Sequence, residues 1–102
     1  MTRATRRKLE IIIEAPMVGQ VERILADEGV RGWSVFAGVE GRGVTGEWRA
    51  DGFSGAEEMR LVIALAGDDA AERVLTRLAA FLDEYPGIVC DSEVRVLRAE
   101  RF

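Results

Sequence analysis

Apolar and polar residues alternate in the first part of the chain in the way that is typical of a β-strand. Between residues 8 and 15 every second side chain is a large apolar one, which predicts a strand that Pro16 ends. Over residues 17–28 the apolar positions instead recur every three or four residues, and Gly29 follows where a helix favours glycine. A helix is therefore expected there, and the β-prone residues 33–37 predict a second strand.

The same order of patterns returns in the second half of the chain. Residues 58–66 alternate again, and we expect the row Met59, Leu61, Ile63 and Leu65 to form one face of a third strand. Helical spacing then runs from about residue 69 to about residue 84, and residues 88–98 supply a last extended stretch. The predicted order of elements is β-α-β-β-α-β.

Two strand-helix-strand units with right-handed crossovers predict an α+β, ferredoxin-like fold. Both helices then cover one face of a four-stranded antiparallel sheet, and 102 residues suffice for one such domain. The other face stays uncovered and is too apolar to remain comfortably in water, so we expect an oligomer. The residues assigned to that face are Ile12, Phe36, Val62, Ala64 and Leu97.

Between residues 38 and about 57 the hydrophobic periodicity disappears, and six of the eleven glycines lie in this stretch. A connection of this length without structure of its own is unusual in a compact domain, so we interpret it as a functional loop. Trp48, Arg49 and Phe53 are its candidate contacts to a partner protein, because large aromatic residues dominate interface energetics. The alternative is that the aromatic side chains pack down on the domain.

The amino-acid composition argues against several classes of functional site and partner. The chain has 14 basic and 18 acidic residues, a net charge of −4, no histidine and one cysteine, which argues against histidine-based catalysis, His/Cys metal sites and an internal disulfide. Cys90 is expected to be a small buried hydrophobe. The acidic balance disfavours nucleic acid as a partner, and no apolar run is long enough for membrane insertion, so we expect a cytoplasmic protein.

Gly41, Arg42 and Gly43 form the one local motif with phosphate-binding chemistry. Backbone N–H groups can approach a phosphate closely at glycines, and a guanidinium adds further donors. A Gly-x-Gly in a glycine-rich loop is also common for flexibility alone.

Several motifs in order along the chain resemble the PII signal-transduction superfamily, and within it the PII-like branch associated with bicarbonate transport and carboxysomes. They are RKLEIII (7–13), GWSV (32–35), GRG (41–43), YPGIV (85–89) and VRVLRAERF (94–102). The loop has no tyrosine and no glutamine after GRG, so uridylylation and the Mg-ATP and 2-oxoglutarate chemistry of the nitrogen-regulatory branch are not expected.

The resemblance implies a homotrimer that is not an enzyme and that binds an adenine nucleotide (ADP, AMP, ATP or cyclic AMP), with or without bicarbonate, between subunits. It further implies regulation of a target protein, such as a membrane transporter or a carbon-fixation component, through the loop. The resemblance also implies which residues bind the nucleotide, through the motifs that match. They are Ser34, Gly41, Arg42, Gly43, Gly87, Ile88, Val89, Arg98 and Arg101.

Individual candidates also have explanations that involve no ligand. Gly87 could end a helix, Ser34 could be an exposed strand hydroxyl, and Arg98 and Arg101 could belong to a solvated terminus. For the whole chain the alternatives are a small-molecule-binding ACT-type domain, which would need neither the glycine-rich loop nor the terminal arginines, or an uncharacterised ferredoxin-like enzyme. Copper-tolerance proteins of similar fold are disfavoured by the absence of histidine.

Overall fold

A computed structural model describes residues 3–44, 46–49 and 58–102. The elements are β1 (Arg3–Glu14), η1 (Ala15–Met17), α1 (Val18–Asp27), β2 (Trp33–Ala37), β3 (Glu40–Gly43), β4 (Gly46–Arg49), β5 (Met59–Ala66), α2 (Asp68–Leu82), β6 (Gly87–Leu97) and η3 (Ala99–Arg101). The predicted β-α-β-β-α-β order is confirmed, and β3 and β4 are additional.

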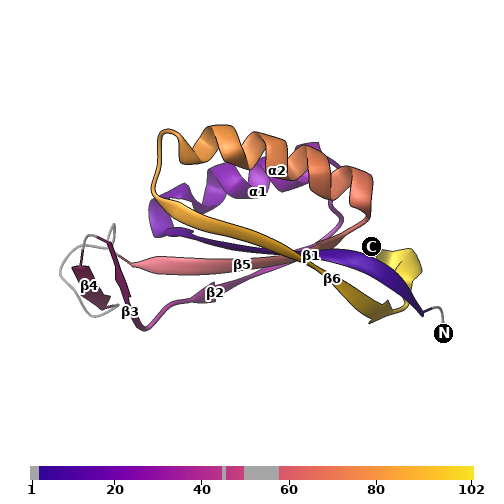
Figure 1. Cartoon of the computed structure of the whole chain (residues 1–102), viewed down its shortest axis with the longest axis horizontal. Helices are drawn as coiled ribbons and strands as arrows, with labels where there is room; N and C mark the ends of the chain where they lie inside the picture. Colours follow the sequence, from indigo (N-terminus) through magenta and orange to yellow (C-terminus); the bar gives the residue numbers. More distant parts are fainter. Residues whose placement is uncertain (1–2, 45, 50–57) are drawn as a thin grey trace.

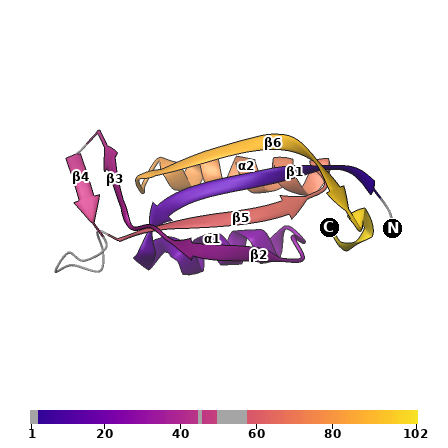
Figure 2. The same ribbon diagram turned by 90° about the horizontal axis from the view of Figure 1, so that it is seen from below.

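The main sheet has four antiparallel strands in the order β2-β5-β1-β6, with α1 and α2 together on one of its faces (Figures 1 and 2). This is the ferredoxin-like arrangement expected from the sequence. The first strand, β1, is central, because it pairs with β5 on one side and with β6 on the other. Ile11, for example, is opposite both Val62 and Val89.

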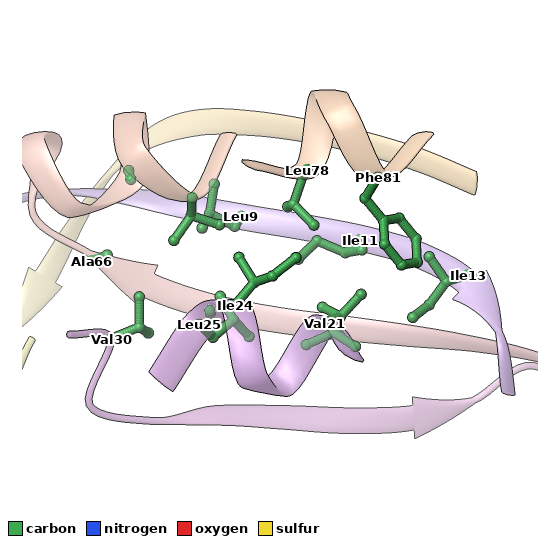
Figure 3. Close-up of a cluster of buried hydrophobic side chains, with 14 residues drawn as sticks. Leu9, Ile11, Ile13, Val21, Ile24, Leu25, Val30, Ala66, Leu78 and Phe81 are labelled. Atoms are coloured by element: carbon green, nitrogen blue, oxygen red, sulfur yellow. The ribbon is translucent and has the colours of Figure 1, made fainter. Parts of the chain in front are cut away.

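The hydrophobic core lies between the sheet and the two helices (Figure 3). The alternate residues Leu9, Ile11 and Ile13 of β1 have no exposed surface, as their spacing predicts. Burial of each such side chain contributes about 1.5–3 kcal/mol, so this layer is the main source of stability. The helices add Val21, Ile24, Leu25, Val74, Leu78 and Phe81.

The prediction for the third strand was wrong about which row is buried. Val62, Ala64 and Ala66 face the helices, whereas Leu61, Ile63 and Leu65 lie on the uncovered face. Both rows of β5 are apolar, so alternation within the strand does not distinguish them. The pairing with β1 determines which row of β5 is buried, because Val62 is opposite the core residue Ile11.

The uncovered face carries an apolar row that crosses all four strands. We call Phe36, Leu61, Ile12 and Ile88 the apolar row, since each is the direct partner of the next across neighbouring strands. Phe36 is 50% exposed and Ile88 60%. Ile12 and Phe36 were correctly assigned to this face.

Strand parity also corrects the assignment of single residues to the uncovered face and to the core. Val62 and Ala64 belong to the core, and Leu97 has the parity of the helix-facing Val89. Cys90 is exposed instead of buried: it is opposite Glu10 on the uncovered face, because its neighbour Val89 takes the helix-facing position.

Part of the segment predicted to be a loop is a β-hairpin. Strands β3 and β4 pair antiparallel and project from one end of the main sheet, at the opposite end of the molecule from the chain termini (Figure 1). Gly46 has a φ of 121°, a conformation that favours glycine. Phe53 lies outside the described residues.

The two helices are joined at their outer surface by charged side chains. Arg73 Nε lies 3.1 Å from a carboxylate oxygen of Glu28, and Arg77 Nη1 lies 3.1 Å from Asp27 Oδ2 and 3.2 Å from Glu28 Oε2. Hydrogen bonds to Asp27 and Glu28 raise the pKa of Arg77. Within the described residues no helix is long and apolar enough to cross a membrane.

Candidate functional site

The two glycines of the Gly-Arg-Gly motif differ in their surroundings within the hairpin. The indole of Trp48 lies over Gly41, where a Cβ would be 2.7 Å from Trp48 Cζ2, and over Gly38, where a Cβ would be 2.7 Å from Trp48 Cη2. A Cβ at Gly43 would meet nothing within 4 Å. Gly41 is therefore required by packing, whereas Gly43 leaves its backbone open to a ligand.

Trp48 is only partly exposed, and its contacts are to the base of its own hairpin. This is the intramolecular packing that the sequence left open as the alternative to partner binding. The opposite hairpin face carries Glu40 across from Arg49 and Arg42 across from Glu47, an arrangement in which opposite charges face each other. Residues 40–42 and 47–49 line a shallow hollow of about 290 Å³.

Gly87, Ile88 and Val89 begin β6, at one edge of the sheet. A Cβ at Gly87 would lie 2.9 Å from the carbonyl oxygen of Ile12 and 3.1 Å from Leu82 Cδ2. Gly87 is part of the strand, so the close approach of β1 and α2 explains this glycine better than a helix stop does. Ile88 is exposed, and Val89 packs against the core.

Ser34 is exposed on β2, the opposite edge strand. Pairing places Ser34 in one row with Ile63, Glu10 and Cys90. Three strand spacings, roughly 14 Å, therefore separate Ser34 from β6. A single chain does not bring Ser34 together with Gly87 to Val89.

Arg98 and Arg101 lie at the far end of the sheet from the hairpin, in the turn that follows β6 (Figure 1). Arg98 has φ 55° and ψ 50°, the left-handed conformation, and ends the strand by turning the chain into η3. Both side chains are exposed, and neither guanidinium makes an ion pair with the described residues. They are free to hold an anion.

Two arginines that the sequence did not single out hold this C-terminal turn. Arg6 Nη2 donates to the carbonyl oxygen of Ala99 at 2.7 Å, and Arg31 Nη1 donates to that of Glu100 at 2.8 Å. They are 93 and 69 residues from their partners along the chain, so no local spacing could reveal them.

The candidate nucleotide-binding residues thus occupy separate places in one chain: the hairpin and the start of β6, the edge strand β2, and the C-terminal turn. Over residues 3–44, 46–49 and 58–102, no three His, Cys, Asp or Glu side chains converge as metal ligands would.

Comparison with known proteins identifies the family. The family model "Nitrogen regulatory protein P-II" matches residues 6–101. An uncharacterized protein from Methanothermobacter thermautotrophicus is 40% identical over 77 residues, which are 74% of this chain and 46% of the relative. The chain spans about half the length of the curated relative it matches.

Solved structures share the fold over the whole chain. CPII, a nitrogen regulatory PII-like protein from Thiomonas intermedia bound to ADP, AMP and bicarbonate, superposes with a TM-score of 0.90 at 22% identity, covering 99% of this chain and 96% of CPII. A putative PII-like signaling protein from Thermus thermophilus gives 0.84 at 17% identity, covering 100% and 99%. At these identities the structures establish the fold.

Proposed function

Because this chain belongs to the nitrogen regulatory protein P-II family, we propose that it is a PII-like signalling protein, not an enzyme, that binds an adenine nucleotide, with or without bicarbonate, between the subunits of a homotrimer. The ADP, AMP and bicarbonate bound by CPII support this ligand class. Adenine nucleotides and bicarbonate are anions, and the exposed guanidinium groups of Arg98 and Arg101 are suited to binding anions.

The observation that carries the intersubunit site is the distribution of the candidate residues around an uncovered apolar row. Ser34 and Gly87 lie at opposite edges of the sheet, and Phe36, Leu61, Ile12 and Ile88 cross the space between. Association through the apolar row would remove it from water and bring the edge of one copy beside the edge of another. Groups that are far apart in one chain would then share one cleft.

Each candidate has a distinct proposed role in that cleft. Arg98 and Arg101 hold phosphate, and it is approached by those backbone N–H groups among Gly87, Ile88 and Val89 that point away from β1. The Ser34 hydroxyl is available to the edge of the adenine. Arg42 and Gly43, which lie next to the hairpin tip, bring the hairpin to the ligand and so connect nucleotide binding to the loop.

The proposed output is contact between the loop and a target protein, such as a membrane transporter or a carbon-fixation component. Val44 at the hairpin tip is fully exposed at 108%, and Arg49 is also exposed, whereas Trp48 is turned inward. A nucleotide switches this surface only if it binds two loop arrangements with different affinity.

Calorimetric titration with AMP, ADP, ATP and cyclic AMP, each with and without bicarbonate, tests the function. We expect saturable binding of at least one of the four, and loss of about tenfold or more in affinity for Arg98→Ala and for Arg101→Ala, the scale of a lost charged hydrogen bond. Arg23→Ala, an exposed arginine on α1, is the matched control and should bind normally. No binding of any nucleotide would refute the function, and unchanged affinity in the double arginine variant would refute the assigned site.

A further inference from the structure

The C-terminal turn is attached to the domain by two arginines from distant parts of the chain. Arg6 on β1 uses all three of its nitrogens: Nη2 donates to the Ala99 carbonyl at 2.7 Å, Nε to that of Phe102 at 3.3 Å and Nη1 to that of Thr5 at 2.7 Å. Arg31, in the connection between α1 and β2, donates from Nη1 to the Glu100 carbonyl at 2.8 Å. The turn therefore lies beside that connection (Figure 2).

The turn makes few hydrogen bonds of its own within the part of the chain that the structure describes. Its own main chain supplies two hydrogen bonds, from Arg101 N to the Arg98 carbonyl and from Phe102 N to the Ala99 carbonyl. A single turn of this kind is not stable alone, and Arg98 also adopts a left-handed conformation that is unfavourable for a residue with a Cβ. Apolar burial adds to these bonds, since Ala99 is 1% exposed and Phe102 is 37% exposed. Among the described residues, Arg6 and Arg31 are thus the side chains from outside the turn that hydrogen-bond to its main chain and fix the direction in which it points.

We propose that Arg31, together with Arg6, is a positioning residue that holds Arg98 and Arg101 in place for the phosphate of the nucleotide. Arg31 is three residues before Ser34, so its bond to Glu100 ties the strand proposed to meet the adenine to the turn proposed to meet the phosphate. A turn that is ordered before binding loses less conformational entropy when the ligand arrives. This inference rests on the proposed function and adds residues that touch the main chain of the turn instead of the ligand.

Arg31→Met tests the inference, because methionine keeps an apolar stem and removes every donor. We expect nucleotide affinity to fall about tenfold, and the amides of Arg101 and Phe102 to exchange faster without nucleotide. The urea midpoint and the oligomeric state should not change, since the Arg31 bond is exposed. Arg31→Lys restores one donor and should recover most of the affinity. Arg23→Met is the matched control and should leave both affinity and exchange as they are.

A double-variant comparison separates positioning from direct contact. If Arg31 acts through the turn, Arg31→Met should cost nothing further once Arg98 and Arg101 are both alanine. Lower affinity with unchanged exchange at Arg101 and Phe102 would overturn the inference, because Arg31 would then act by itself. Wild-type affinity in Arg31→Met would also overturn it. If the wild-type protein binds no nucleotide, the proposed function fails instead, and unchanged exchange in Arg31→Met would reject the anchoring of the turn as well.

Discussion

Gly87 is a residue at which β6 comes too close to its neighbours to carry a side chain. The nearest atom to a Cβ there is a backbone oxygen, that of Ile12, which cannot move without shifting β1. β1 is the central strand and carries the core residues Leu9, Ile11 and Ile13. The glycine therefore has a packing reason that is independent of any ligand.

Gly87→Ala should lower the free energy of unfolding by about 1–3 kcal/mol, the usual cost of overpacking a site that cannot relax. The measurement is the urea midpoint in the absence of nucleotide. Gly32→Ala is the control: a Cβ there meets nothing within 4 Å and the residue has no positive φ, so its stability should be unchanged or slightly higher. Equal midpoints for the two variants would show that β6 can move away from Ile12.

At the scale of elements, the hairpin of β3 and β4 is held by its one large aromatic side chain, Trp48, instead of by alternating apolar residues on one face. Its two strands pair through Gly41 with Trp48 and through Gly43 with Gly46, so it has no hydrophobic face of alternating side chains. The indole lying over Gly38 and Gly41 replaces that face. This packing connects the hairpin to the residue that leaves the main sheet, Gly38, whose N–H donates to the Met59 carbonyl at 2.8 Å.

Trp48→Ala should make the hairpin amides exchange faster while amides of β1 and β5 keep their protection. Gly41→Ala should have the same effect, because its Cβ would displace the indole, and Gly43→Ala should not. Hydrogen exchange read at the paired residues Glu40 and Arg49 reports the result. Slow exchange that survives both Trp48→Ala and Gly41→Ala would mean that the strand pairing alone holds the hairpin.

The elements themselves were largely predictable, because the period of two in β1 and the period of three and four in the helices follow from which side chains meet the core. The predictions that were wrong concern features that depend on pairing between distant strands. Leu61 and Val62 are equally apolar, so only the register with β1 shows which one is buried. Cys90 was misplaced for the same reason, and the hairpin has no hydrophobic period to detect.

The candidate site was predictable only through motif resemblance. Arg98 and Arg101 stand in a recognisable ending, and the structure leaves them exposed and without ion-pair partners among the described residues. The bonds from Arg6 and Arg31 join segments 93 and 69 residues apart, and they become visible only when the chain ends are brought together.

For the whole molecule, the uncovered sheet face is the feature that a monomer explains least well. The helices cover one face only, and the apolar row of Phe36, Leu61, Ile12 and Ile88 crosses the other from edge to edge. Isolated exposed apolar residues are normal, but a continuous row across a sheet indicates an interface. An interface at this face would also join the separated candidate residues. A variant that does not assemble should therefore not bind nucleotide.

Light scattering at micromolar concentration should therefore give a mass about three times 11.3 kDa for the wild-type protein. Leu61→Asp places a carboxylate in the middle of the apolar row, and burial of that unpaired charge costs several kcal/mol, so the variant should dissociate while its helix-covered core stays folded. Val44→Asp adds the same charge at the fully exposed hairpin tip and should remain a trimer. Dissociated Leu61→Asp should lose nucleotide affinity although Ser34, Gly87, Arg98 and Arg101 are all intact, because no single copy brings them together. A monomeric variant that still binds nucleotide with wild-type affinity would place the site within one chain and contradict the intersubunit cleft.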